Sequence, residues 1–300
     1  MIVHLIDGTY ELFRHFYGLR RAKQPAPDPF GAVRGVLQTV LQLIETGATH
    51  IGVATDHVIE SFRNRLWAEY KTGVGIDPAL WAQFHPLEAA LAAMGVAVWP
   101  MIELEADDAL ASAAALAAVD PRVEKVCIWT PDKDLAQCVV GQRIVQVDRR
   151  SGQIRDADGV RAKFGVAPVS IPDYLAVVGD SADGYPGLPG WGAKSAAAVL
   201  ARFEHLESIP EDSEQWRAGV LNSANLNRVL RDRWSDALLF RDLATLRADA
   251  PLFSNVDALR WTGPTSDFAA VSARLNGAQL LDRATRLAGS KGAPTGIPAD

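Results

Sequence analysis

Short apolar runs alternate with amphipathic stretches over the first half of the chain. The runs typical of buried strands are 2–6, 50–54, 96–100, 125–129 and 143–147. Between them, 32–44, 78–94 and 106–118 carry apolar residues at helical spacing. The apolar runs lack clean alternation, so we expect both faces of the sheet to be covered. The pattern predicts an α/β domain with a mostly parallel central sheet flanked by helices.

After about residue 166 the strand pattern stops. Glycine and proline break the remaining sequence into short segments, and we expect helices at roughly 171–178, 193–203, 214–220, 222–231 and 234–245. The segment 288–300 is rich in glycine, proline and alanine and is expected to fray. The predicted organisation is an α/β core over 1–165, a helical region over 166–287 and a flexible tail over 288–300.

Composition narrows the class of protein. The chain has 300 residues, 48% hydrophobic and 22% charged, which is typical of a globular protein and not of a disordered one. No apolar run is long enough for a membrane span, and the first residues lack the pattern of a signal peptide. The two cysteines, Cys127 and Cys138, cannot form a disulfide framework or a four-cysteine zinc site. We therefore expect a cytoplasmic protein without a membrane partner.

Acidic residues follow four of the predicted strands. Asp7 and Asp56 end the first two, and Glu105, Asp107 and Asp108 follow the third; Asp132 and Asp134 follow the fourth. A single aspartate after a strand is most often a turn former or a helix cap. The carboxyl ends of parallel strands, however, form one edge of a sheet, where ligands bind. Four acidic strand ends at one edge indicate a site.

Clustered carboxylates repel one another unless cations neutralise them. A set of oxygen ligands without a histidine or cysteine partner suits hard ions such as Mg²⁺ or Mn²⁺. An acid-only site with room for two ions suits in-line displacement at phosphorus. One ion would help to generate the attacking hydroxide, and the other would stabilise the leaving oxygen.

A glycine-rich segment, 179–195, begins the helical half. It contains Asp180 and Asp183, and it has five glycines from Gly179 to Gly192 inclusive. It is not a nucleotide-binding phosphate loop, because Ala193 separates Gly192 from Lys194. It predicts a tight turn into a helix whose free N–H groups could bind a phosphate. The alternative is a helix–turn–helix loop with structural glycines.

The motifs together resemble the bacterial 5′ nuclease family, which includes flap endonucleases, 5′→3′ exonucleases and the 5′-nuclease domain of DNA polymerase I. The resemblance lies in five motifs that occur in order: Ile6-Asp7-Gly8 with Arg14; 61–63 through Glu69-Tyr70-Lys71; 105–108; Thr130-Pro131-Asp132-Lys133-Asp134-Leu135; and 179–183 through 189–194. It becomes weak after roughly residue 205. It implies a PIN-like nuclease core followed by a helical clamp on duplex DNA.

The resemblance also implies roles for individual residues. The family's metal-binding acids match Asp7, Asp56, Glu105, Asp107, Asp108, Asp132, Asp134, Asp180 and Asp183. Basic residues near the scissile phosphate match Arg14, Arg63 and Lys71, and Tyr70 matches an aromatic residue on which a base can stack. The helical clamp, which often holds K⁺, matches Gly187, Gly190, Gly192 and Lys194. The alternatives are that Tyr70 only packs and that Arg63 lies on a solvated face.

Two stretches depart from the family pattern. Residues 72–77, in the segment 63–85 that we call the arch, contain glycine and little charge where relatives commonly carry another basic residue. We therefore expect a weaker grip on a 5′ single strand. In the second departure, Gly184-Tyr185 stands where asparagine followed by an aliphatic residue is usual.

The sequence thus predicts a structure-selective 5′ nuclease with two or more Mg²⁺ or Mn²⁺ ions. Its substrate would be flap, nicked or branched DNA with a 5′ end. RNA–DNA hybrids are further expected partners, and the protein would act as a monomer. The formal charge of −6 becomes +3 without the nine predicted site acids, so the overall acidity does not exclude DNA binding. The alternatives are a non-catalytic relative that binds branched DNA and another Mg²⁺-dependent phosphoesterase.

Overall fold

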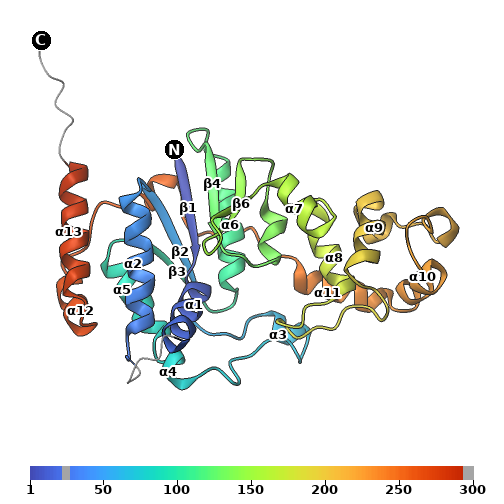
Figure 1. Ribbon diagram of the computed structural model, residues 1–300, viewed down its shortest axis with the longest axis horizontal. Helices are drawn as coiled ribbons and strands as arrows, with labels where there is room; N and C mark the ends of the chain where they lie inside the picture. Colours follow the sequence, from blue (N-terminus) through green and yellow to red (C-terminus); the bar gives the residue numbers. More distant parts are fainter. Residues whose placement is uncertain (22–27, 293–300) are drawn as a thin grey trace, which may run out of the picture.

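A six-stranded sheet in the order β3-β2-β1-β4-β5-β6 forms the centre of the structure, a computed structural model that describes residues 1–21 and 28–292 (Figure 1). The strands are β1 (Ile2–Asp7), β2 (His50–Asp56), β3 (Ala97–Met101), β4 (Lys125–Trp129), β5 (Ile144–Asp148) and β6 (Gln153–Arg155). The first five are parallel, as predicted, and β6 pairs antiparallel with β5.

Helices cover both faces of the sheet. Successive strand residues point to opposite sides, so the apolar strands present side chains that must be buried on each face. Ile6 and Val53 pack with α1 (Gly8–Arg21), α2 (Gly31–Glu45) and α5 (Phe84–Ala93). Val3 and Leu5 pack on the other side with α6 (Ala106–Ala118). The apolar runs in the sequence are therefore strands buried on two faces.

A second group of helices lies beyond the β6 edge (Figure 1). It comprises α7 (Ala157–Phe164), α8 (Ile171–Val178), α9 (Ala193–Phe203), α10 (Ser223–Asp232) and α11 (Trp234–Ala244). They share an apolar core that includes the fully buried Trp216. Short 3₁₀ helices occupy Asp134–Cys138, Pro168–Ser170, Leu206–Ser208, Ser213–Gln215 and Val256–Leu259.

The last two helices return to the α/β core. Phe268 of α12 (Phe268–Arg274) and Leu280 of α13 (Ala278–Gly292) pack in the same apolar cluster as α2 and α5. The Trp261 backbone N–H donates to the Thr49 carbonyl, and its indole N–H donates to Met94. The C-terminal part of the predicted helical region thus lies on the sheet domain, at the far side from α9 (Figure 1).

The prediction of one helix over 78–94 is wrong. The structure has α4 (Pro78–Trp81) and α5, separated by Ala82 and Gln83. Pro86 has no N–H for the carbonyl of residue 82, so the helical ladder cannot continue. Gln83 is buried at the break, and its side-chain oxygen accepts from the N–H groups of Ala32 and Val33 at the start of α2.

Other elements also differ from the prediction. The helix expected at 214–220 is only the 3₁₀ turn Ser213–Gln215, and Gly219 follows with φ +81°. The strand β6 and the helices α1, α7, α12 and α13 were not predicted. Since α13 continues to Gly292, residues 288–292 are helical and not a frayed tail; residues 293–300 lie outside the described part. Within 1–21 and 28–292, no helix has the length and apolarity needed to span a bilayer.

Candidate functional site

Asp7 ends the central strand β1 and is buried at the carboxyl edge of the sheet. One carboxylate oxygen accepts from the Tyr10 backbone N–H and the other from the Thr130 hydroxyl. Burial raises the pKa of Asp7 to about 7, and the charges of Asp56 and Asp132 add to the shift. This carboxyl therefore disfavours its charged form in the protein without a metal ion.

Asp56 and Asp107 lie beside Asp7. The Asp56 carboxylate accepts from the Ala106 N–H at the start of α6. Burial raises the pKa of Asp107 well above its usual value, and the charges of Asp132 and Asp7 raise it further. We call Asp7, Asp56, Asp107 and Asp132 the first carboxylate group.

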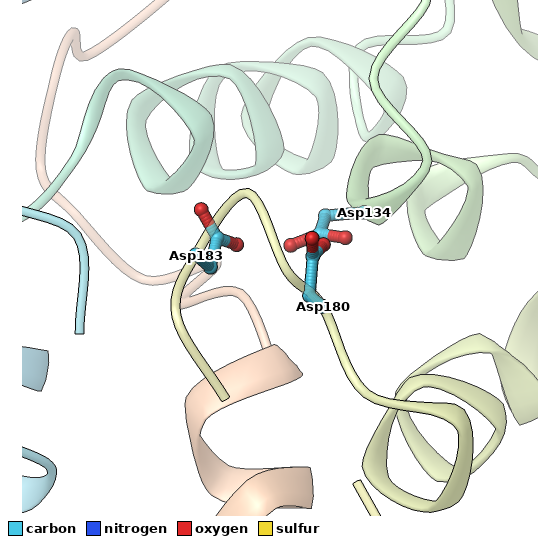
Figure 2. A group of neighbouring side chains, drawn as sticks. All are labelled: Asp134, Asp180 and Asp183. Atoms are coloured by element: carbon cyan, nitrogen blue, oxygen red, sulfur yellow. The ribbon is translucent and has the colours of Figure 1, made fainter. Parts of the chain in front are cut away.

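Asp134, Asp180 and Asp183 form a second carboxylate group (Figure 2). One oxygen from each lies within 4.8 Å of the others; the side chains of Asp134 and Asp180 are buried, and that of Asp183 is mostly buried. Burial raises the pKa of Asp134 well above its usual value, and the charges of Asp132, Asp183 and Asp180 contribute. Asp132 is exposed and acts on both groups, since its charge also raises the pKa of Asp7.

Two lysines partly neutralise these acids. Lys71 Nζ lies 2.7 Å from Glu105 Oε2 and 3.3 Å from Asp183 Oδ1. Burial would lower the pKa of Lys71, but Asp183 and Glu105 outweigh it and the pKa rises well above its usual value. Lys133 Nζ lies 2.7 Å from Asp180 Oδ2. Sequence reasoning missed Lys133, although its place between two predicted ligands, Asp132 and Asp134, was a signal.

Arg63 is not placed to contact a phosphate, which corrects its predicted catalytic role. The guanidinium is 1% exposed. All five of its N–H donors are used, on Asp108, Glu105 and the carbonyls of Leu243 and Thr245. Arg63 therefore joins the arch to α6 and to the end of α11. The alternative that it lies on a solvated face is also wrong.

Asp108 is the partner of Arg63, and we withdraw it from the predicted metal ligands. Its side chain is 0% exposed, and both oxygens accept from Arg63, each at 2.8 Å. The backbone N–H groups of Arg247 and Glu105 supply two further bonds. Glu105 also bonds Arg63 and Ser61 through Oε1, but its Oε2 faces Lys71. Glu105 stays a predicted ligand through that oxygen.

Tyr70 is buried in the helical core and offers no free face to a base, so the predicted stacking role is wrong. Its hydroxyl lies 3.4 Å from Glu105 Oε2. Arg14 is bound through Nε and Nη2 to the buried Glu11, and its side chain is partly exposed. The role of Arg14 stays a prediction.

The arch is joined tightly to the second carboxylate group. The Lys71 N–H donates to the Asp183 carbonyl, and the Trp67 indole N–H donates to the Gly184 carbonyl. Gly184 has φ +85°, and a Cβ there would lie 2.0 Å from the Glu69 carbonyl oxygen. The unusual glycine thus permits a close approach between arch and loop, an effect that the sequence alone did not reveal.

The predicted clamp residues surround the start of α9. Gly190, Gly192 and Lys194 line an open pocket of about 490 Å³ together with Ser195. Ser195 and Gly192 bond one another at the first turn. Gly187 differs from these: it is buried, and a Cβ would lie 2.4 Å from the Gly179 nitrogen. Gly187 therefore closes the turn and does not line the pocket.

We expect the Asp7→Asn variant to be the more stable protein in EDTA at pH 8. The pKa of Asp7 is raised, so the stability it contributes is complete below its unfolded value near 4 and is lost as the pH rises to about 7. Because asparagine does not ionise, the variant should have a free energy of unfolding about 1 kcal/mol or more above that of the parent at pH 8. Thermal unfolding of both proteins in EDTA from pH 4 to pH 8 measures it. A difference in Tm that does not grow with pH would contradict the assignment.

We expect the Asp108→Ala variant to lose about 3–5 kcal/mol of stability in EDTA, because Arg63 would be left buried without its partner. Denaturant unfolding measures the loss. Asp107→Ala, in the same turn of α6, is the matched control and should be as stable as the parent or more so, since it removes a carboxylate with a raised pKa. Equal stability of Asp108→Ala and the parent would exclude the structural role.

Comparisons with known proteins cover most of the chain. Residues 2–165 match the model of the 5'-3' exonuclease N-terminal resolvase-like domain, and residues 166–267 match that of the 5'-3' exonuclease C-terminal SAM fold. DNA polymerase I of Pseudomonas aeruginosa is 34% identical over 265 residues, covering 85% of this chain but 28% of that protein. The 5'-3' exonuclease of Buchnera aphidicola subsp. Schizaphis graminum is 27% identical and is covered over 87% of its length, with 83% of this chain aligned.

Solved structures show the same fold. T5 5'-exonuclease with bound divalent metal ions (zinc) has a TM-score of 0.65 at 16% identity, covering 97% of this chain and 99% of that one. The catalytic core of Rad2 in complex with DNA substrate has a TM-score of 0.60 at 15% identity, covering 95% and 91%. At these identities the likeness concerns the fold.

Proposed function

This chain belongs to the 5'-3' exonuclease family, and we propose that it is a structure-selective 5′ nuclease, a hydrolase that cleaves phosphodiesters at or near the 5′ end of flap, nicked or branched DNA. The observation that carries the proposal is the pair of carboxylate groups at one edge of the sheet, with pKa values raised by burial and by one another. Relatives named 5'-3' exonuclease and a fold neighbour in complex with DNA support it.

The residues present fit divalent ions. Both groups offer carboxylate oxygens, the donors that Mg²⁺ and Mn²⁺ prefer. Asp134 Oδ1 is buried and has no hydrogen-bond partner among the described residues, as expected of an oxygen reserved for a cation. We propose that the first carboxylate group, with Glu105, holds one ion and that Asp134, Asp180 and Asp183 hold another. Bound ions would supply positive charge at the phosphate and lower the pKa of the attacking water.

Lys71 is the residue we propose to act on the scissile phosphate. Its ammonium comes from the arch and lies between Glu105 and Asp183. Once cations neutralise the acids, this ammonium can pair with a phosphate oxygen and stabilise the charge that develops there. Arg14 is a second candidate, because it is partly exposed on the helix that follows Asp7.

Duplex DNA would bind through its backbone. Gly190, Gly192 and Lys194 surround the start of α9, where free N–H groups favour a phosphate. K⁺ at this turn is part of the proposal. Because phosphate contacts dominate, affinity should fall steeply with salt and depend little on base sequence. We also propose that its substrates include ones with an RNA strand and that it acts as a monomer. Its place would be in replication or repair within the cytoplasm.

Cleavage of a 5′-labelled flap on a nicked duplex tests the function. With Mg²⁺ we expect short 5′ products, and with EDTA none. Single-stranded DNA and blunt duplex serve as controls and should be cut more slowly. Asp134→Asn should lower kcat by at least a hundredfold while flap binding in EDTA stays unchanged, since it removes a charged ligand from a preorganised site.

Binding of the flap without cleavage in Mg²⁺ or Mn²⁺ would favour a non-catalytic DNA-binding protein. Cleavage of a small phosphate ester that duplex DNA does not inhibit would favour a different phosphoesterase. Either result would overturn the proposed nuclease.

The charge-poor arch leads to a separate expectation. Val74 is 91% exposed at the arch, between Gly73 and Gly75. Val74→Arg should lower KM for a long 5′ flap several-fold with little change in kcat, because a new cation would attract the single strand. Val119→Arg is the matched control: Val119 is 81% exposed at the opposite end of α6 from the carboxylates. An unchanged KM in Val74→Arg, or an equal fall in the control, would argue against it.

A further inference from the structure

Two buried oxygen atoms beside the second carboxylate group lack a hydrogen-bond partner among the described residues. They are Asp134 Oδ1 and the Tyr185 hydroxyl oxygen. Tyr185 is 1% exposed, so solvent does not satisfy its hydroxyl. Buried polar groups in proteins are nearly always hydrogen-bonded, so this unpartnered pair requires an explanation.

The backbone places the Tyr185 side chain on the side of the acids. Tyr185 and Asp180 exchange two backbone hydrogen bonds, of 3.0 and 2.9 Å, and form an antiparallel bridge. Side chains of residues directly opposite in such a bridge lie on the same face. Because Asp180 faces Asp134 and Asp183 (Figure 2), Tyr185 shares that face.

The ring of Tyr185 is held in place by its neighbours. It stacks on Phe240 of α11, with ring centroids 5.7 Å apart. The turn before it is held to the arch by the bond from the Trp67 indole to the Gly184 carbonyl. A phenylalanine could make the same packing contacts, so packing does not account for the hydroxyl.

A tyrosine hydroxyl is an uncharged donor at neutral pH and can donate a hydrogen bond to a carboxylate.

The three acids of this group differ in their partners. Lys133 pairs with Asp180, and Lys71 pairs with Asp183. Asp134 Oδ1 has no partner in the described structure, and neither has the Tyr185 hydroxyl, which the bridge to Asp180 places on the same face. Carboxylates that bind metal ions are themselves usually fixed by hydrogen bonds from a surrounding layer of residues.

We propose that Tyr185 is a positioning residue of this metal site. The two unpartnered oxygens are not hydrogen-bonded to one another in the structure; with a divalent ion bound, the Tyr185 hydroxyl would donate to the Asp134 carboxylate and hold it in the orientation that binds the ion. The inference rests on the proposed function, in which Asp134, Asp180 and Asp183 hold an ion. It adds a residue that lies outside the nine predicted acids.

Mn²⁺ binding to Tyr185→Phe, followed by electron paramagnetic resonance of the free ion, tests the proposal. We expect the affinity of one ion site to fall about tenfold, the lower end of the effect of removing such a partner. Thermal unfolding in EDTA should give a Tm equal to that of the parent or higher, because the variant removes only an unpartnered buried hydroxyl. Added Mn²⁺ should then raise the Tm less than it does in the parent.

Tyr174→Phe is the matched control. Tyr174 is buried in the same helical core, and its pKa is raised by burial without a contribution from an acidic neighbour. It should bind Mn²⁺ like the parent. Equal Mn²⁺ affinity in Tyr185→Phe and the parent, or equal losses in both tyrosine variants, would overturn the proposal.

Asp134→Asn separates this proposal from the proposed function. If the parent binds Mn²⁺ and Asp134→Asn loses one ion, the metal site holds, and Tyr185→Phe alone decides the role of the hydroxyl. In the Asp134→Asn background, Tyr185→Phe should cause no further loss, since the ion whose ligand the hydroxyl orients is already lost. If the parent binds no Mn²⁺, both the metal site and the role of Tyr185 are wrong.

Discussion

Repulsion among carboxylates at the carboxyl edge of the sheet is the constraint on which the site depends. Parallel strands deliver Asp7, Asp56 and Asp134 to one place, and burial there raises the pKa of each. The folded chain offsets part of this repulsion with its own cations, Lys71 and Lys133. The remainder, shown by the raised pKa values, is the driving force for binding external cations.

The same edge contains acids with two different tasks. Asp107 and Asp108 are neighbours in the first turn of α6, but only Asp108 meets the buried Arg63. A carboxylate with four hydrogen bonds has no oxygen left for an ion, whereas Asp107 faces other acids. Sequence position cannot separate them, because the distinction depends on where an arginine from a distant segment enters.

Local pattern was enough to predict most of the fold. Helices 171–178 and 193–203 were predicted to the residue, since their apolar spacing and bounding glycines are local signals. Apolar spacing alone led to the wrong predictions. It overlooked Pro86, which interrupts the helical ladder where the buried Gln83 caps α2. It also could not show that α12 and α13 return to the sheet domain, because those contacts join residues more than 150 positions apart.

The sequence predicted that the acids would meet at one edge of the sheet, but it did not predict which side chains support them or that Asp108 pairs with Arg63. The acids could be identified because they follow strands, and the carboxyl ends of parallel strands meet at one edge of the sheet. The roles of Arg63 and Tyr70 were wrong because both side chains turn inward, where Arg63 compensates Asp108 and Tyr70 fills the helical core. Exposure of a side chain in the arch is set by packing against α11, which no spacing in the sequence encodes.

The second departure from the family pattern, Gly184, lies at the joint between the arch and the acidic loop. Gly184 lets the Glu69 carbonyl approach the acidic loop, and the bonds from Trp67 and Lys71 close the joint. The foot of the arch and the second carboxylate group are therefore one packed body. Lys71 is therefore joined to Asp183 twice, through its backbone N–H and through its ammonium, so a change in charge at the second carboxylate group acts on Lys71 by both routes.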